Sequence, residues 1–146
     1  MEDNKLAKVL VVDDEPNIVE LLTVSLKFQN FDVYSASSGN EALRVAREIN
    51  PDAYILDVMM PGMDGLEATR LIRRLDRPDR CAVPIVALTA NADPEDAKQY
   101  LSIGMAAVVE KPIKPERLRM AMNAAMSASQ AGSQGDPKAQ PGRAVA

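Results

Sequence analysis

The stretch Lys8-Val9-Leu10-Val11-Val12-Asp13-Asp14-Glu15-Pro16 contains a pattern that recurs along the rest of the chain. Residues 8–12 form a run of Leu and β-branched side chains, which is typical of a strand buried on both faces of a parallel sheet. The run ends at two aspartates, and Pro16 suits the first turn of a helix because the N–H it lacks has no partner there. We therefore predict a strand, an acidic strand end and a helix, in that order.

Four more apolar runs follow at the spacing of alternating strands and helices, and we predict strands over 31–36, 53–56, 84–88 and 106–109. Helix starts are indicated by the capping-box pattern Ser38-Gly39-Asn40-Glu41, by Asp93-Pro94 and by Pro115. Five strands alternating with five helices predict an α/β fold with a doubly wound parallel sheet. Right-handed crossovers favour the flavodoxin-like strand order 2-1-3-4-5.

The length of 146 residues is that of one domain. After about Ser127 the composition shifts to Ser, Gln, Ala, Gly and Pro, without aromatic residues. We predict a folded domain over 1–127 and a disordered low-complexity tail over 128–146, because such a tail cannot bury enough apolar surface to fold. A tail of this length leaves no room for a helix-turn-helix unit, so we expect no DNA-binding output domain.

The composition excludes several classes of function. The chain has no histidine, which excludes Ser-His-Asp catalysis and histidine-based zinc sites, and its one cysteine, Cys81, excludes an internal disulfide. A net charge of -4 provides no basic field for nucleic acid, and no apolar run approaches the ~20 residues of a membrane span. We expect a cytoplasmic protein that binds neither nucleic acid nor a membrane.

Polar side chains stand at the ends of four of the five predicted strands. They are Asp13-Asp14 after the first, Asp57 after the third, Thr89 after the fourth and Lys111 after the fifth. The second strand ends in Ser35-Ala36 and lies at the edge in the predicted order. Ligands of doubly wound sheets bind at the carboxyl ends of the strands, so we expect the other four ends to converge on one site.

Three carboxylates at roughly 5 Å spacing repel one another by about 10 kcal/mol in total, which rivals the stability of a small domain. Such a cluster must protonate, move apart or hold a cation. Lys111 supplies one positive charge, and an all-oxygen set of ligands favours Mg²⁺ over a transition metal. Asp57 stands centrally and needs no base to be ionised, so it is the candidate nucleophile for a phosphoryl group.

Four motifs at these strand ends resemble those of the CheY-like receiver domain of bacterial two-component response regulators. They are Val11-Val12-Asp13-Asp14-Glu15, the segment from Leu56 to Gly65, Leu88-Thr89-Ala90 and Glu110-Lys111-Pro112. The resemblance covers about residues 8–126 and fits a stand-alone regulator or a receiver of a hybrid kinase. It implies a switch that is phosphorylated by a sensor histidine kinase or a histidine phosphotransfer protein and then changes the surface that binds a downstream protein.

The resemblance also implies a role for each residue of the site. Asp57 is the expected phosphoryl acceptor. Asp14, Asp57 and the main-chain carbonyl of Met59 are the expected Mg²⁺ ligands, and Asp13 contacts the ion mostly through water. Lys111 pairs with the phosphoryl group, and the Lys111-Pro112 peptide bond is expected to be cis. The Met59 side chain is expected to hinder water from reaching the acyl phosphate.

The resemblance makes Thr89 the switch residue, which moves toward the phosphoryl oxygen. Val108 stands where this family usually has an aromatic residue that moves with the threonine, so we expect the signal to pass through the segment 89–92 and the helix after it. The first helix, near Ile18 and Leu22, is expected to meet the phosphoryl donor. The fourth helix, the fifth strand and the fifth helix are expected to meet the downstream partner.

Two other functions remain open. The absence of an aromatic residue at Val108 motivates a scaffold that binds partners independently of phosphorylation. A Mg²⁺-dependent phosphohydrolase is less favoured, because the sequence offers no second acid or base beside Asp57. In the leading hypothesis the protein catalyses its own phosphorylation and dephosphorylation, but its output is binding.

Overall fold

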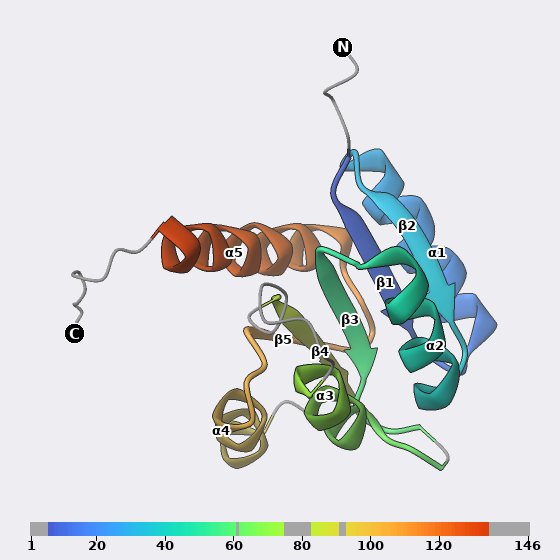
Figure 1. The fold of residues 1–146 in the computed structure, drawn as a ribbon, viewed down its shortest axis with the longest axis vertical. Helices are drawn as coiled ribbons and strands as arrows, with labels where there is room; N and C mark the ends of the chain where they lie inside the picture. Colours follow the sequence, from blue (N-terminus) through green and yellow to red (C-terminus); the bar gives the residue numbers. More distant parts are fainter. Residues whose placement is uncertain (1–5, 61, 75–82, 91–92, 135–146) are drawn as a thin grey trace.

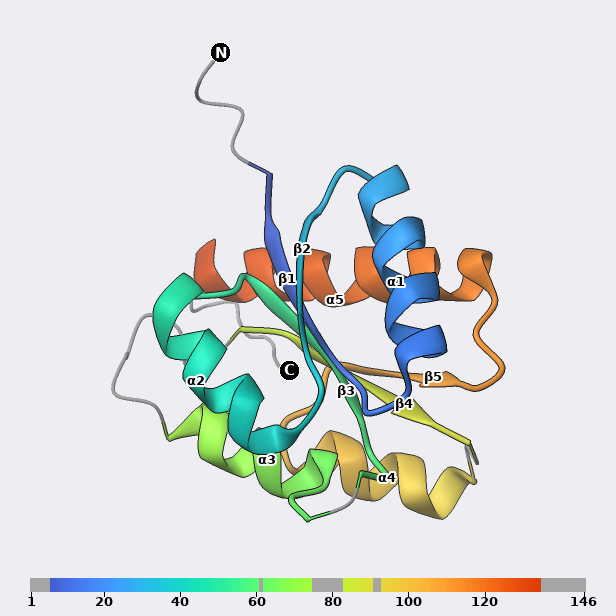
Figure 2. The same ribbon diagram turned by 90° about the vertical axis from the view of Figure 1, so that its right-hand side faces the viewer.

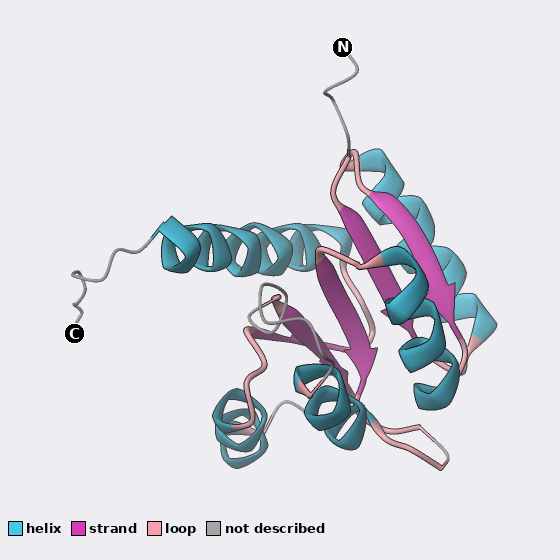
Figure 3. Cartoon of the chain, in the orientation of Figure 1, coloured by secondary structure: helices cyan, strands magenta, loops and turns pink. Residues whose placement is uncertain are grey.

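A computed structural model describes residues 6–60, 62–74, 83–90 and 93–134, with side chains up to residue 127 (Figures 1 and 3). Cys81 lies outside these ranges. Strands and helices alternate throughout the described part of the chain. They are β1 (Lys8–Val12), α1 (Pro16–Phe28), β2 (Asp32–Ala36), α2 (Gly39–Ile49), β3 (Ala53–Asp57), α3 (Gly65–Arg73), β4 (Ile85–Thr89), α4 (Pro94–Ser102), β5 (Ala107–Glu110) and α5 (Pro115–Gln134).

The five strands form one parallel sheet in the order β2-β1-β3-β4-β5, which confirms the predicted fold and topology. Each strand lies within one residue of its predicted bounds at either end. β4 and β5 end one residue later than predicted because Thr89 and Glu110 still pair with each other in register. The sheet therefore places the carboxyl ends of β1, β3, β4 and β5 side by side at one edge.

Helices cover both faces of the sheet, as Figure 2 shows. On one face, α1 and α5 pack through Leu22, Leu26 and Leu118 onto alternate residues of the strands. On the other face, α2, α3 and α4 pack through Ala46, Ile72 and other buried side chains onto the strand residues that alternate with the first set. This alternation explains why β1, β3 and β4 are apolar almost throughout, since their central positions are buried from both faces, whereas the edge strand β2 is only partly buried.

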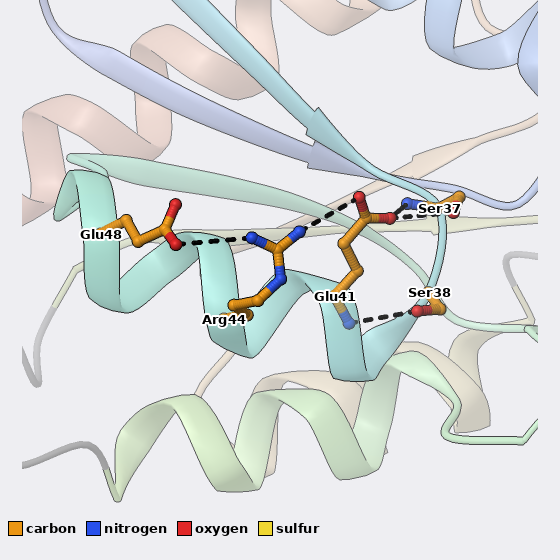
Figure 4. Close-up of polar contacts among 5 residues, drawn as sticks. All are labelled: Ser37, Ser38, Glu41, Arg44 and Glu48. Carbon is orange, nitrogen blue, oxygen red and sulfur yellow. Dashed lines mark hydrogen bonds and ion pairs between the residues drawn. The ribbon is translucent and has the colours of Figure 1, made fainter.

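The start of α2 differs in detail from the capping box that its sequence predicts (Figure 4). The Ser38 hydroxyl accepts a hydrogen bond from the Glu41 N–H at 3.1 Å, as expected. The Glu41 carboxylate, however, accepts from the N–H and the hydroxyl of Ser37, at 2.8 and 2.9 Å, rather than from the N–H of Ser38. These bonds lower the pKa of Glu41 and tie the helix to the residue directly after β2.

α5 continues to Gln134, beyond the predicted end of the domain at residue 127. Residues 128–134, which the sequence analysis placed in the disordered tail, are therefore helical, and residues 135–146 lie outside the described ranges. The segment continues a helix that is already formed, and extending a helix is far easier than starting one. None of the helices in the described part has the length and apolarity needed to cross a bilayer.

The cap of α2 provides a test of local stability. We expect Ser38→Ala to lower the free energy of unfolding by about 1 kcal/mol, because it removes the acceptor for an N-terminal N–H. Arg44→Ala is the matched control on the same helix: it removes exposed ion pairs with Glu41 and Glu48, and we expect a loss below about 0.5 kcal/mol. Urea denaturation of both variants measures the difference, and equal losses would contradict the proposed role of the cap.

Candidate functional site

The structure brings the predicted polar residues together at the carboxyl edge of the sheet. Asp13 follows β1, Asp57 is the last residue of β3, Thr89 is the last residue of β4, and Lys111 follows β5. Asp13, Asp57 and Thr89 are each at most 3% exposed, although all three are polar. Buried polar groups are costly unless they have partners, so their concentration at one sheet edge marks a site and not ordinary core packing.

The three aspartates form a compact acidic cluster. Asp13, Asp14 and Asp57 each offer a carboxylate oxygen, and these oxygens lie within 4.8 Å of one another. The Lys111 ammonium lies between two of them, with Nζ 3.1 Å from Asp13 Oδ2 and 3.3 Å from Asp57 Oδ2. Glu15, to which the sequence analysis gave no role, lies 3.8 Å from the same nitrogen and adds a further negative charge at the mouth of the site.

Backbone hydrogen bonds orient the two buried carboxylates and the lysine. Asp13 Oδ1 accepts from the Glu15 N–H at 2.9 Å, and Asp57 Oδ1 accepts from the Met59 N–H at 3.1 Å. These bonds leave Oδ2 of each aspartate directed at Lys111. The Lys111 N–H donates to the Thr89 carbonyl oxygen at 2.8 Å, and the Lys111-Pro112 peptide bond is cis, as the resemblance implied.

The electrostatics of the cluster shift the pKa of Asp57 upward. Burial is the largest cause, the nearby Asp13 carboxylate adds to it, and Lys111 and the Met59 N–H oppose it, so that the pKa rises from 3.8 to about 6. Burial by itself would lower the pKa of Lys111, but the Asp13 and Asp57 carboxylates outweigh it and raise that pKa. Lys111 is therefore charged at neutral pH. Ionising Asp57 in the folded protein, by contrast, lowers the free energy of unfolding.

The residues of this cluster fit a hard divalent cation. Oδ2 of Asp13 is buried and is the one such side-chain atom in the described ranges without a hydrogen bond of good geometry; Lys111 meets it only as an ion pair. Three carboxylates against one ammonium leave two uncompensated negative charges (3 − 1 = 2). An all-oxygen cluster of this kind suits Mg²⁺, which prefers a few carboxylates and retains several waters.

Gly65, the last residue of the motif that begins at Leu56, lies directly against the backbone of Asp57. A Cβ placed on Gly65 would lie 2.5 Å from the Asp57 carbonyl oxygen and 2.9 Å from Val58 Cα. The Gly65 N–H also donates to the Val58 carbonyl at 3.1 Å. Asp64 caps the same helix end by accepting a hydrogen bond from the Glu67 N–H at 2.9 Å. Only glycine allows α3 to begin this close to the backbone of Asp57.

Other predicted residues lie at or near the cluster in different environments. The Met59 side chain is 74% exposed beside Asp57. Val108 is half-buried and packs against the core under α2, α3 and α4. Leu22, which was expected near the surface that meets a phosphoryl donor, is fully buried against the sheet, so that expectation is wrong for this residue. Ile18 is half-buried, and Leu21 is the exposed leucine of α1.

Comparison with known proteins gives a consistent result. The sequence profile of the response regulator receiver domain matches residues 9–123. The DNA-binding response regulator MtrA of Mycolicibacterium smegmatis is 40% identical over 116 residues, which are 80% of this chain and 49% of that protein. The alkaline phosphatase synthesis transcriptional regulatory protein PhoP of Bacillus subtilis is 37% identical over 84% of this chain and 50% of its own length.

Solved structures show the same likeness. The chemotaxis protein CheY4 of Vibrio cholerae superimposes with a TM-score of 0.76 and 31% identity, covering 83% of this chain and 99% of its own. The match therefore covers nearly all of the CheY4 structure. By contrast, the chain spans about half the length of the curated relatives it matches.

The contact between Gly65 and Asp57 predicts a large effect of a small substitution. We expect Gly65→Ala to destabilise the fold by about 1–3 kcal/mol, because the new methyl group meets rigid backbone. Gly39→Ala is the matched control at the first residue of α2, where the methyl group meets the flexible Met63 side chain at 2.7 Å. Thermal unfolding distinguishes them, and a Gly65→Ala variant as stable as Gly39→Ala would contradict the close approach.

The raised pKa of Asp57 predicts a pH-dependent gain in stability on its removal. A carboxyl whose folded pKa lies above its unfolded value destabilises the fold when ionised, so the penalty is present above about pH 6 and fades as pH falls toward 3.8. We expect Asp57→Asn to stabilise the metal-free protein by on the order of 2 kcal/mol at pH 7.5 and by much less at pH 4.5. Chemical denaturation in EDTA at both pH values measures it.

Magnesium provides the control for this prediction, since a cation bound by the cluster favours the ionised carboxylate. Saturating Mg²⁺ should raise the melting temperature of the wild type and reduce or remove the advantage of Asp57→Asn. An advantage that does not change with pH or with Mg²⁺ would show that Asp57 carries no electrostatic penalty.

Proposed function

The chain belongs to the response regulator receiver domain family, and we propose that it acts as a phosphorylation-dependent signalling switch in which Asp57 accepts the phosphoryl group. The geometry of Lys111 is the observation that supports this proposal: its ammonium lies 3.1 and 3.3 Å from Asp13 and Asp57, within reach of a phosphoryl group carried by Asp57. A family of this kind implies a histidine kinase as partner, which would supply the phosphoryl group from a phosphohistidine.

The proposed reaction is a direct transfer to a carboxylate. An oxygen of Asp57 attacks the phosphorus, the new O–P bond forms as the P–N bond to the donor histidine breaks, and the histidine nitrogen leaves with the bonding electrons. Asp57 needs no general base, because its pKa of about 6 leaves it mostly ionised at neutral pH. The donor nitrogen takes its proton from solvent or from its own protein.

The remaining residues of the site act on charge and orientation. In this proposal Asp13, Asp14, Asp57 and the Met59 carbonyl hold Mg²⁺, which when bound neutralises negative charge on the phosphoryl oxygens. Lys111 neutralises a further oxygen and turns from its aspartate partners toward the phosphoryl group. Thr89, buried at the end of β4, offers its hydroxyl to the same group.

Val108 bears on how the phosphorylated site signals. It packs against the core as a small aliphatic side chain at the position where the resemblance leads us to expect an aromatic one. The signal is therefore proposed to pass from Thr89 to α4 without a moving aromatic ring. The same observation favours the second candidate, a phosphorylation-independent scaffold, which predicts that Asp57→Ala and Asp57→Glu bind a downstream partner equally well.

Phosphoryl uptake is directly measurable. We expect the wild type to gain the mass of one phosphoryl group when incubated with acetyl phosphate and Mg²⁺, and we expect Asp57→Asn to gain none. Asp96→Asn, on α4 and outside the acidic cluster, is the matched control and should be phosphorylated like the wild type. Intact-mass spectrometry gives the answer, and labelling of Asp57→Asn, or no labelling of the wild type by acetyl phosphate and by a phosphorylated kinase, contradicts the proposal.

The exposed Met59 side chain predicts an effect on the lifetime of the phosphorylated form. We expect Met59→Asn to change the rate of dephosphorylation severalfold, because it replaces an apolar side chain beside Asp57 with one that can hydrogen-bond water. Met120→Asn, a similarly exposed methionine on α5, is the control. The decay of the phosphorylated mass after removal of the donor measures both, and an unchanged rate in Met59→Asn would show that this side chain does not govern access of water.

A further inference from the structure

An open groove of about 900 Å³ lies between the last turns of α1 and the first turns of α5, on the side of the sheet opposite α2, α3 and α4. Its floor and walls include Val24 and Phe28 from α1 and Met120 from α5. These three side chains are 62%, 88% and 61% exposed. Phe28 is one of only two phenylalanines in the chain, and the other, Phe31, packs against the core.

The apolar residues of this face have the spacing of a helix-packing surface. Leu21, Val24 and Phe28 are the exposed large apolar residues of α1 and recur at intervals of three and four. Apolar residues at this spacing form a stripe along one face of α1, and a second helix can pack against it by inserting its own side chains between them. Aromatic and methionine side chains gathered in a groove are typical of sites that receive an amphipathic helix.

The charged residues that line the groove, here called its rim, have a net charge opposite to that of the protein as a whole. Lys114, Arg117 and Arg119 line it, together with one acidic residue, Glu116, which pairs with Arg119 at 3.6 Å. The lining therefore carries a net charge of +2 (3 − 1 = 2), whereas the chain carries -4. A lining that combines apolar and basic side chains selects for a partner helix whose polar face is acidic, because opposite charges favour the encounter and like charges disfavour basic competitors.

We propose that this α1–α5 groove binds an acidic amphipathic helix of another protein. A second copy of this chain fits poorly, since a symmetric contact would set two basic rims against each other. The chain's own residues 135–146 also fit poorly, because they contain a single large apolar residue, Val145, and carry one acidic against two basic side chains. The partner's helix would place apolar residues on Val24, Phe28 and Met120 and its carboxylates against Lys114, Arg117 and Arg119.

The test uses the whole 146-residue chain, unphosphorylated and in EDTA, so that a negative result does not depend on phosphoryl transfer. The probe is a fluorescent peptide with leucines at helix spacing and glutamates on its other face; lysine-for-glutamate and scrambled peptides are its controls. We expect Phe28→Ser to weaken binding of the acidic peptide at least about tenfold, or about 1.4 kcal/mol, in fluorescence polarisation. The double variant Lys114→Glu/Arg117→Glu should weaken it similarly.

Two exposed residues of α4 provide matched controls, and Leu101→Ser and Lys98→Glu should leave the affinity unchanged. Equal binding of the basic or scrambled peptide, no binding of the acidic one, or full binding to Phe28→Ser overturns the proposal. So does a dimer in analytical ultracentrifugation that Phe28→Ser dissociates, which would identify a second copy as the occupant. Chemical-shift changes in residues 135–146 on Phe28→Ser would instead identify the chain's own tail.

Discussion

The ammonium of Lys111 touches carboxylate oxygens of both Asp13 and Asp57, and most features of the site follow from this contact. Two buried carboxylates at the ends of neighbouring strands repel each other, and keeping both ionised is costly unless a cation lies beside them. Burial first, and then repulsion from Asp13, raise the pKa of Asp57, and the one lysine offsets them only in part. The remaining negative charge favours the binding of a divalent ion. Asp57 nevertheless stays mostly ionised at neutral pH, since its pKa is about 6.

The parallel sheet is what allows these groups to meet. Asp13, Asp57, Thr89 and Lys111 come from four separate strand ends, and the order β2-β1-β3-β4-β5 sets those ends next to one another. Backbone donors then fix the side chains, as the Met59 N–H does for Asp57. Gly65 completes the support, because its lack of a side chain lets α3 begin against the backbone of the central strand. Chemistry and packing therefore depend on the same few residues.

The α1–α5 groove is built on a different principle from the acidic cluster. The cluster concentrates buried charge, whereas the groove exposes apolar side chains, among them Phe28, inside a basic rim. α5 starts a few residues after Lys111 and lines the groove with its first turns. The two surfaces are thus close in the chain but call for different ligands, a phosphoryl group at one and an acidic helix at the other.

The sequence by itself determined the fold class, the strand order and the members of the acidic cluster. Uninterrupted apolar runs identify strands buried on both faces, and a polar residue that directly follows such a run must lie at the carboxyl edge of the sheet, whatever the details of packing. Helix starts at Pro16, Asp93 and Pro115 were readable for the same reason, since capping and proline effects are local. The four motifs then pointed to one family.

Only the tertiary structure decided the features that depend on distances between segments. Glu15 joins the lysine because of how the first loop turns, and Gly65 matters because α3 meets β3 at that point. Leu22 faces the core and Phe28 faces solvent, although both are large apolar residues of one helix, because the rotation of α1 against the sheet sets their directions. The helical residues 128–134 continue an established helix, a cooperative effect that composition does not reveal.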